Sequence, residues 1–389
     1  MKMKLTRSSF WFFALLVLWG EAGVGFSLNN SSRRDYITWD DLIVDGYRLD
    51  FRDAGNQRKV LLVDKNGGGD SLTVQGAVDM VPENNAERVK IHILPGIYRE
   101  KVKIPVSKPY ISFIGKQDQV SETVITWKDR ASDRDKNGFF IGTWSSASVT
   151  VESDYFCASG VTFEAKKLIL KQPYFMFHSH KISFLYQNLH ILSQNTVVSR
   201  GGGVDGNQAV ALRISGDKAM FYKVRFLGSQ DTLLDETGTH YFYQCFIQGS
   251  IDFIFGNAKS LYQESSIHVV GDAFAIAAQH RNSPDEDTGF SFTNCTVNGT
   301  GSIYLGRAWA GYSRIIYSYC EFDINIRPEG WEDWRTPSRQ NTVLFGEYQC
   351  GGRGADRRGR VPWSKALKYL EARPFLDITF IKGEQWLRL

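Results

Sequence analysis

Residues 224–256 read VRFLGSQDTLLDETGTHYFYQCFIQGSIDFIFG, and this stretch contains the repeat that decides the fold. A small or apolar residue precedes a larger apolar one by two positions at Val224–Phe226 and again at Cys245–Ile247. The pattern returns at Ser265, Cys295 and Cys320. Successive first members are therefore 21, 20, 30 and 25 residues apart. A degenerate period of this length, built from short strands, indicates a solenoid, because each coil must stack on its neighbours to bury its apolar face.

Short β-rich runs continue from about Val60 onward and are separated by turns of Gly, Asp, Asn and Ser. Convincing amphipathic helices are scarce, and the best candidates are 72–81 and 363–370. Together with the repeat, this pattern predicts an all-β fold, a right-handed parallel β-helix in which short strands and turns make up each coil. A β-sandwich with coincidental spacing is the alternative.

The repeat also brings two acidic residues into one column. Asp231 and Asp252 each follow a repeat marker by seven residues, so in stacked coils their side chains share a face at about 5 Å, the strand spacing. Gln208 and Gln230 are 22 residues apart, which places Gln208 near this column one coil earlier. Two carboxylates this close cannot both ionise cheaply, so the pKa of one should rise while a cation keeps the other charged. Such a pair can divide into acid and nucleophile; two turn aspartates without chemical roles are the alternative.

Four segments surround these residues, and they follow one another along the chain. They are QAVALR at 208–213, GSQDT at 228–232, GSIDFIFG at 249–256 and LGRAW at 305–309. In this order they resemble the signature segments of plant pectinesterases (pectin methylesterases), and the likeness extends from about Gln75 to Trp363. The resemblance implies a right-handed parallel β-helix and a carboxylic-ester hydrolase that converts the methyl esters of homogalacturonan (pectin) into pectate and methanol.

Carried over to this sequence, the resemblance assigns a catalytic role to five residues. It makes Asp252 the nucleophile that attacks the ester carbonyl, and Asp231 the group that protonates the departing methanol and then activates water. Gln208 and Gln230 would stabilise the oxyanion, and Arg307 would keep Asp252 ionised and oriented. These roles need neither a metal nor another cofactor. A surface ion pair is the alternative for Arg307.

The resemblance also implies a set of substrate contacts. Thr143 and Trp144 match positions that touch the substrate in the family, and Gln208 and Arg307 belong to the same set. The rings of Trp309 and Trp331 would stack on sugar rings, because aromatic faces pack well against a pyranose. A purely structural packing role is the alternative for each tryptophan.

The N-terminus is typical of a secreted protein. Basic residues precede an apolar run at 10–18, and small residues follow it, so residues 1–25 are expected to be a cleaved signal peptide. Residues 26–59 form an N-terminal extension, and residues 60–389 form the β-helix domain. The likeness is thus to the family form without an N-terminal inhibitor-like region, and autoinhibition is not expected. Candidate glycosylation sequons begin at Asn29, Asn30, Asn294 and Asn298.

Composition and charge narrow the range of partners. The net charge is only +4, with basic and acidic residues interspersed, so no basic tract marks a nucleic-acid binder. No apolar stretch reaches 18 residues, which excludes a membrane span. The five cysteines lack zinc-site spacing and are expected mostly as small buried residues. A monomer in the cell wall is expected, with a proteinaceous pectinesterase inhibitor as a further partner.

Residues 166–194 depart from the family pattern. This segment has no Gly, Asp or Glu, and it contains His178, His180 and His190. In the family, 161–164 would continue almost directly into a sequence like that at 195–196. Translated intron sequence is one explanation and a genuine loop extension is the other, since loop-closure entropy grows slowly with length. A transcript lacking codons 166–194 would decide between them.

Other functions remain as alternatives. A catalytically inactive pectin-binding β-helix would retain pectin without releasing methanol. A β-helical polysaccharide lyase or glycosidase would cleave the chain itself. The sequence has neither the Gly-x-Ser-x-Gly segment of serine esterases nor the His-Glu-x-x-His of zinc hydrolases.

Overall fold

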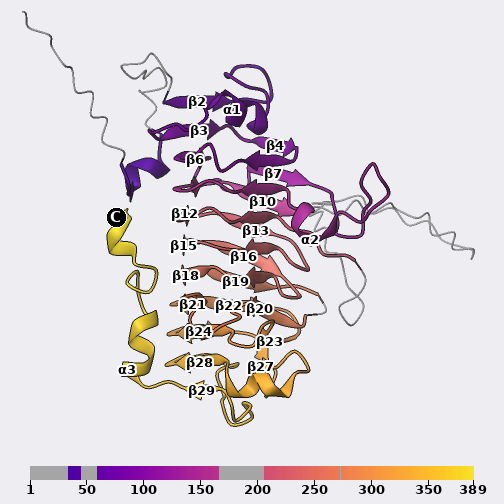
Figure 1. Cartoon of the computed structure of the whole chain (residues 1–389), viewed down its shortest axis with the longest axis vertical. Helices are drawn as coiled ribbons and strands as arrows, with labels where there is room; N and C mark the ends of the chain where they lie inside the picture. Colours follow the sequence, from indigo (N-terminus) through magenta and orange to yellow (C-terminus); the bar gives the residue numbers. More distant parts are fainter. Residues whose placement is uncertain (1–33, 45–58, 166–205, 272) are drawn as a thin grey trace, which may run out of the picture. The chain divides into compact units, whose positions relative to one another are not determined.

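The computed structural model describes residues 34–44, 59–165, 206–271 and 273–389. Strands from successive coils pair in parallel, as Leu212 does with Leu233 and Leu233 with Ile254. The coils stack one after another from β2 to β29 (Figure 1). This confirms the all-β, parallel β-helix predicted from the repeat, with the right-handed crossovers that parallel strands favour. The predicted signal peptide and the segment 166–194 lie outside the described residues.

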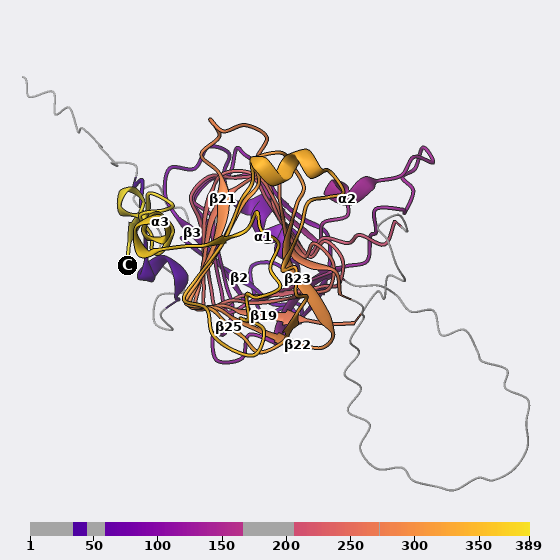
Figure 2. The ribbon, with the colours of Figure 1, turned by 90° about the horizontal axis from the view of Figure 1, so that it is seen from below.

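Three sheets form the sides of the coil and are seen along the stack in Figure 2. The eleven-stranded sheet contains β2 (Val60–Val63), β3 (Val89–Ile93), β6 (Ile111–Ile114), β9 (Cys157–Ser159), β12 (Ala219–Tyr222), β15 (Thr239–Tyr243), β18 (Lys259–Gln263), β21 (Gly289–Thr293), β24 (Arg314–Ser318), β28 (Leu344–Tyr348) and β29 (Lys365–Ala366). The eight-stranded sheet contains β4 (Gly96–Arg99), β7 (Thr123–Trp127), β10 (Thr162–Ala165), β13 (Arg225–Leu227), β16 (Phe246–Gly249), β19 (Ser266–Val269), β22 (Thr296–Gly299) and β25 (Glu321–Phe322). The nine-stranded sheet contains β5 (Val102–Ile104), β8 (Val149–Val151), β11 (Leu212–Ile214), β14 (Leu233–Asp235), β17 (Ile254–Gly256), β20 (Ala275–Gln279), β23 (Ser302–Ala308), β26 (Asn325–Ile326) and β27 (Trp331–Glu332).

The repeat markers each follow a residue in the left-handed backbone region. Lys223, Gln244 and Asn294 have φ of 50°, 53° and 53°, and each directly follows a strand of the eleven-stranded sheet. Glu264, Tyr319 and Gln349 behave in the same way, with φ of 51°, 55° and 47°. At the first five of these corners along the chain, the backbone N–H donates to a carbonyl of the next coil, as that of Gln244 does to Gln263 O at 3.0 Å. The sequence repeat therefore marks a recurrent corner whose conformational cost is offset by bonds to the next coil.

The interior is filled by a ladder of rings. Phe221, Phe242, Tyr262, Phe292 and Tyr317 stack in sequence, with successive centroids 4.7, 4.6, 4.6 and 4.5 Å apart. All five side chains are fully buried. Stacked rings add to the free energy gained from burial alone, so one ring per coil stabilises both the core and the register.

A polar cluster is enclosed beside this ladder. The Asp235 carboxylate lies 2.5 Å from His240 Nδ1 and accepts the Tyr262 hydroxyl at 2.6 Å, while His240 Nε2 lies 2.8 Å from Gly216 O. Burial alone would lower the pKa of His240, but the Asp235 charge and the Gly216 carbonyl outweigh it and raise that pKa. The cluster satisfies its own polar groups, as a buried network must.

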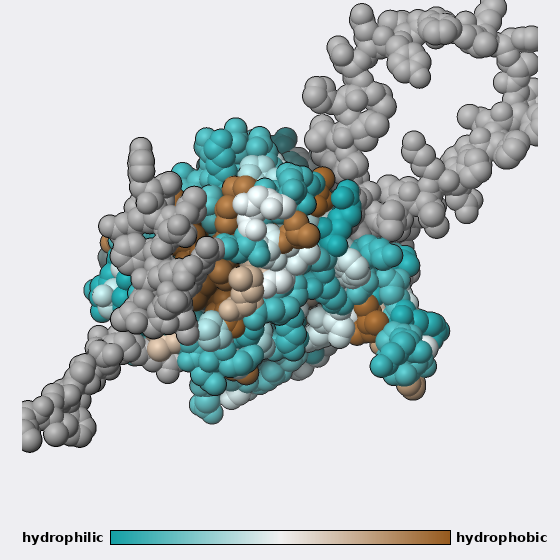
Figure 3. Space-filling view, turned by 90° about the horizontal axis from the view of Figure 1, so that it is seen from above, coloured by the Kyte–Doolittle hydropathy of each residue, from teal (hydrophilic) through white to brown (hydrophobic). Residues whose placement is uncertain are grey.

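Helix α1 (Val74–Met80) covers one end of the stack, and the C-terminal segment runs along its side (Figure 1). Helix α1 closes the first coil with three fully buried residues, and Figure 3 shows hydrophobic patches surrounded by hydrophilic residues on this end of the molecule. The short helices are α2 (Gly142–Ser145), α3 (Tyr369–Ala372), η1 (Trp39–Leu42), η2 (Pro337–Asn341), η3 (Arg373–Phe375) and η4 (Gly383–Gln385). After β29 the chain returns along the eleven-stranded sheet, and β30 (Leu387–Arg388) pairs with β1 (Ile37–Thr38) (Figure 1).

The predicted helix at 72–81 is confirmed as α1, whereas the one at 363–370 is wrong. Lys365–Ala366 instead forms the edge strand β29, because it pairs with β28 at the end of the stack. Helix α3 begins only at Tyr369, where the Glu371 carboxylate accepts the N–H of Lys368 at 2.8 Å. Among the described residues, no helix combines the length and apolar character needed to cross a membrane.

Candidate active site

Asp231 and Asp252 lie opposite one another on adjacent coils, directly ahead of β14 and β17. The bridge between Gln230 and Ile251 sets this register, and the N–H of Asp231 donates to Ile251 O at 3.0 Å. The shared column predicted from the 21-residue spacing is therefore present. Asp252 in turn donates its N–H to Ala275 O at 2.8 Å, so the next coil holds it in the same way.

Both aspartates adopt left-handed backbone conformations, with φ of 61° at Asp231 and 46° at Asp252. The two turns have the same construction, a Gly-Ser pair two residues before the aspartate, and Ser229 Oγ lies 2.9 Å from Ser250 Oγ. A side chain on Gly249 would collide with Phe253, which fills the interior, so glycine is required there. Strained residues of this kind persist only where the surrounding structure holds them, and they cluster at functional sites.

Arg307, on the outer face of β23, binds Asp252 with two N–H groups. Its Nε lies 2.7 Å from Asp252 Oδ1, and its Nη2 contacts Oδ2. Arg307 belongs to an outward column that also contains Leu234, Phe255 and Ala278. The Asp252 side chain is only 8% exposed, so this fork-to-fork pair is largely shielded from water.

Burial and charge separate the two carboxyl groups. Burial, together with the nearby Asp252 charge, raises the pKa of Asp231 well above its ordinary value, and Arg307 opposes this shift. Burial also raises the pKa of Asp252, but the charge and hydrogen bonds of Arg307 act in the opposite direction. Asp231 is therefore the group that binds a proton more readily, whereas Arg307 favours the ionised form of Asp252.

The two glutamines flank this pair. Gln230 is 5% exposed and immediately precedes Asp231, and its carbonyl accepts the N–H of Ala209 at 3.2 Å. Gln208 thus lies one coil earlier, as predicted, and its own carbonyl accepts the N–H of Ala131 at 2.9 Å. The backbones of the two glutamines therefore lie on neighbouring coils and close in register to the aspartates, where amide donors to a developing oxyanion would be needed.

Aromatic rings line the surface next to the carboxylates. Trp144, which follows Thr143 in α2, is 42% exposed, and its Nε1 donates to Glu236 Oε1 at 2.7 Å. The centroid of Trp309 lies 6.2 Å from that of Trp144 and 4.3 Å from that of His280. The sequence motifs gave no signal for Glu236 or His280, although the register places them in one column with Trp309 at the ends of neighbouring strands.

Trp331 is not part of this surface, so the prediction that it stacks on a sugar is corrected. It is 1% exposed, and its ring stacks inside the core on Phe345 at 4.7 Å. It pairs with Gly306, whose missing side chain leaves room for the indole. The tryptophan that reaches the site is Trp334, whose centroid lies 3.7 Å from Arg307 Cζ and 6.5 Å from that of Trp309. Side chains alternate between the inner and outer faces of a strand, and Trp331 pairs with the inward position Gly306. This alternation could have distinguished Trp331 from Trp334.

A β-helix that presents this carboxylate pair beside an arginine defines the protein as a carboxylic-ester hydrolase. The pectinesterase family profile matches residues 60–172 and 173–384. The pectinesterase QRT1 of Arabidopsis thaliana is 54% identical over 381 residues, which cover 93% of this chain and 92% of that protein. The chain belongs to the pectinesterase family.

Solved structures agree with this assignment. The pectin methylesterase from carrot superposes with a TM-score of 0.69 at 31% identity, over 84% of this chain and 94% of that one. A pectin methylesterase crystallised with a hexasaccharide has a TM-score of 0.64 at 21% identity, over 82% of this chain and 96% of that one. The second similarity supports the fold alone.

Proposed function

We propose that this hydrolase removes methyl groups from methyl-esterified homogalacturonan, with Asp252 as nucleophile and Asp231 as acid and base. The observation that carries the proposal is the unequal pair: Arg307 binds the Asp252 carboxylate, and burial together with the Asp252 charge raises the pKa of Asp231 well above its ordinary value. Equal carboxylates could not supply both a nucleophile and a proton donor at the same pH.

In the first half-reaction, an Asp252 oxygen attacks the ester carbonyl carbon. The amide groups of Gln208 and Gln230 donate hydrogen bonds to the oxyanion of the tetrahedral intermediate. The intermediate collapses to an acyl-enzyme anhydride, and the methoxy group leaves as methanol with the proton from Asp231.

In the second half-reaction, Asp231 is a carboxylate and acts as a base. It takes a proton from a water molecule, which attacks the acyl carbon and releases the galacturonate carboxylate and Asp252. Asp231 is then protonated again, and Arg307 again neutralises Asp252, so the pair returns to its starting state.

The aromatic surface is the proposed binding site for the polysaccharide. The ring centroids of Trp144 and Trp309 lie 6.2 Å apart, so the two rings offer neighbouring apolar faces to pyranose units, and Thr143 stands next to Trp144. The hexasaccharide bound to a pectin methylesterase of the same fold supports a site that accepts several sugar units.

The cell wall is the proposed place of action, because the N-terminal sequence is that of a secreted protein. Of the two sequons in the described residues, Asn294 has an exposed side chain at its corner, whereas Asn298 Oδ1 lies 2.7 Å from His268 Nδ1. Glycosylation is therefore proposed at Asn294. We further propose a monomer that a proteinaceous pectinesterase inhibitor can block, which size-exclusion chromatography and inhibition of methanol release would test.

The deciding experiment measures methanol released from highly methylated pectin by the purified secreted protein, alongside the Asp252→Asn variant. Release by the wild type that disappears in the variant is expected. Reducing ends and unsaturated products are measured in the same samples, and their formation would instead indicate a glycosidase or a lyase. Retention of pectin without methanol release would indicate the inactive binding protein.

A further inference from the structure

The segment that follows β27 is folded around the side chain of Glu332. Its carboxylate accepts the N–H of Trp334 at 2.9 Å and that of Arg335 at 3.2 Å. Both recipients are in the left-handed region, with φ of 60° and 54°. Two consecutive non-glycine residues in that region are costly, and two charge-assisted hydrogen bonds offset the cost. Glu332 therefore fixes the direction in which Trp334 leaves the chain.

Trp334 is directed onto the catalytic arginine. Its ring centroid lies 3.7 Å from Arg307 Cζ, and the centroid of Phe274 lies 4.9 Å from the same atom. The guanidinium thus contacts two aromatic rings as well as the Asp252 carboxylate. A planar cation that rests on a ring face is attracted to it and loses rotational freedom.

The rest of the segment is tied to the same region. Gln340 Nε2 donates to Asp333 Oδ2 at 2.7 Å, and Arg339 Nη1 donates to Ala308 O at 2.6 Å. Ala308 lies between Arg307 and Trp309, so the segment is anchored next to both residues. At its start, Trp331 is anchored in the core. The position of Trp334 is therefore determined from both sides.

We infer that Trp334, fixed by Glu332, is a positioning residue that holds the Arg307 guanidinium in its two-point bond to Asp252. The inference rests on the proposed function, because it gives Trp334 a role only through the nucleophile. If the ring is lost, Arg307 can turn away from the carboxylate, and Asp252 then binds a proton more readily.

The test compares the pH dependence of kcat/KM for methanol release in Trp334→Leu and Trp334→Tyr. Leu keeps much of the apolar volume but has no ring, whereas Tyr keeps a ring face. The expected result for Trp334→Leu is an acidic limb displaced to higher pH and a kcat about tenfold lower, the effect of a misplaced catalytic group. Trp334→Tyr is expected to retain the wild-type limb. KM is expected to change less than kcat in both variants.

Glu332→Ala provides an independent variant, and Glu329→Gln is its matched control. Glu329 is an exposed carboxylate three residues earlier in the same segment. Glu332→Ala is expected to displace the acidic limb in the same direction as Trp334→Leu, and Glu329→Gln is expected to leave it in place. Thermal unfolding of every variant shows that the proteins compared are folded.

An unchanged acidic limb in a folded Trp334→Leu protein would overturn the inference. In that case a raised KM alone would show that Trp334 contacts the sugar instead. Equal losses in the Leu and Tyr variants without any limb displacement would also overturn it. Failure of the proposed function itself has a different signature, since Asp252→Asn would then retain methanol release.

Discussion

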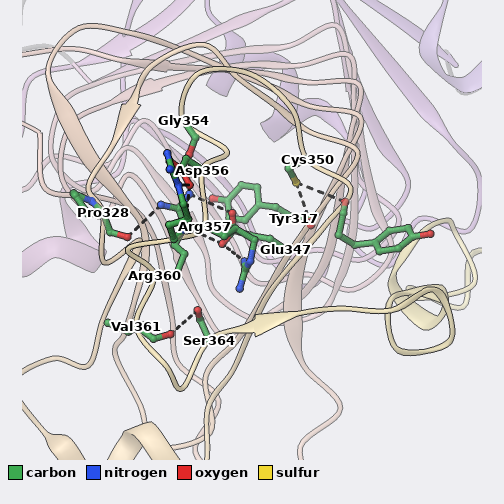
Figure 4. A network of polar contacts seen from close by, with 12 residues as sticks. Tyr317, Pro328, Glu347, Cys350, Gly354, Asp356, Arg357, Arg360, Val361 and Ser364 are labelled. Atoms are coloured by element: carbon green, nitrogen blue, oxygen red, sulfur yellow. Dashed lines mark hydrogen bonds and ion pairs between the residues drawn. The ribbon is translucent and has the colours of Figure 1, made fainter.

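Glu347 and Asp252 are both buried carboxylates bound by arginine, and they differ in the number of arginines that contact them. Glu347 on β28 is 3% exposed and is contacted by both Arg357 and Arg360 (Figure 4). Arg360 Nε lies 3.1 Å from Glu347 Oε1, and other N–H groups of Arg360 donate to carbonyls such as Gly354 O at 2.7 Å. Asp252 is 6% exposed but meets one arginine and lies beside a second carboxyl group.

This difference separates a structural ion pair from a reactive one. The Glu347 cluster satisfies its charges and donors within itself, and it fixes the loop before β27 through the contact of Arg360 with Pro328 O at 3.3 Å. At Asp252, a single guanidinium lies near two carboxyl groups, and the charge of Asp252 helps to raise the pKa of Asp231. When one arginine must neutralise two carboxyl groups, their pKa values are perturbed, and perturbed pKa values are what acid–base catalysis requires.

The largest effect is expected from Asp252→Asn. We expect kcat for methanol release to fall at least about 10⁴-fold, or about 5 kcal/mol in activation free energy, because an amide cannot replace the nucleophile. Thermal unfolding is expected to change little. A variant that keeps a tenth of the activity would contradict the assignment of Asp252 as nucleophile.

Glu347→Gln is expected to lower stability and leave kcat nearly unchanged, the reverse of Asp252→Asn. Removing the charge leaves the buried guanidinium of Arg360 without its counter-ion, which is expected to lower the free energy of unfolding by about 3 kcal/mol. Chemical denaturation would measure this loss. At a temperature where the variant is folded, kcat is expected within about threefold of wild type, the size of a minor perturbation of about 0.6 kcal/mol. A large loss of kcat with unchanged stability would show that the two pairs are not functionally distinct.

Arg307→Lys keeps the positive charge but not the two-point geometry. A lysine ammonium cannot form the planar fork, so we expect kcat/KM to fall about 100-fold, or about 2.7 kcal/mol. The acidic limb of the pH profile should move to higher pH, since the cation that opposes the raised pKa of Asp252 is bound less well. Wild-type kcat/KM in this variant would mean that charge alone suffices.

Trp309→Ala is expected to have a smaller effect, on binding. Loss of the ring should raise KM for methylated pectin about tenfold, or about 1.4 kcal/mol, with less change in kcat. Trp331→Phe is the matched control, because its ring lies in the core; it should lower stability and leave KM unchanged. A raised KM in the control would restore Trp331 to the substrate surface.

The smallest expected change is one of stability, and it is measured in Asp231→Asn separately from the activity that this variant loses with its acid and base. A buried carboxyl group whose pKa is raised binds its proton more tightly in the folded state, so it destabilises the protein as pH rises from its ordinary pKa through the raised one. The amide avoids this loss. We expect the variant to be more stable than wild type by about 1 kcal/mol at neutral pH, with the difference vanishing in acid. A constant difference across pH would show that Asp231 does not titrate in this way.

Parts of the site were predictable because they repeat with the coil. The 21-residue offset between Val224 and Cys245 carries over to Asp231 and Asp252, and the parallel register preserves it. The same reasoning predicted the position of Gln208, one coil before Gln230. The motif resemblance located Arg307 and Trp309, because both lie on one regular strand or directly after it.

The two tryptophans whose roles were misassigned from the sequence lie where the coil is irregular. Trp331 and Trp334 are three residues apart, and the backbone between them leaves the regular strand. Their environments depend on the left-handed turn that Glu332 holds, which no local periodicity encodes. The helix predicted at 363–370 is wrong for a similar reason, because Lys365–Ala366 pairs with β28 at the edge of the sheet, and this pairing is not encoded in the local periodicity.

The sequence by itself determined the stacking of the coils, the column that unites the two aspartates, and the family to which the chain is similar. These features depend on local periodicity and short motifs, which a parallel solenoid converts directly into spatial order. Only the tertiary structure decided which tryptophan covers Arg307, which one fills the core, and how unequally the two aspartates are neutralised. Those outcomes depend on burial and on contacts between irregular segments far apart in the chain, because charge and exposure are set by surroundings and not by spacing.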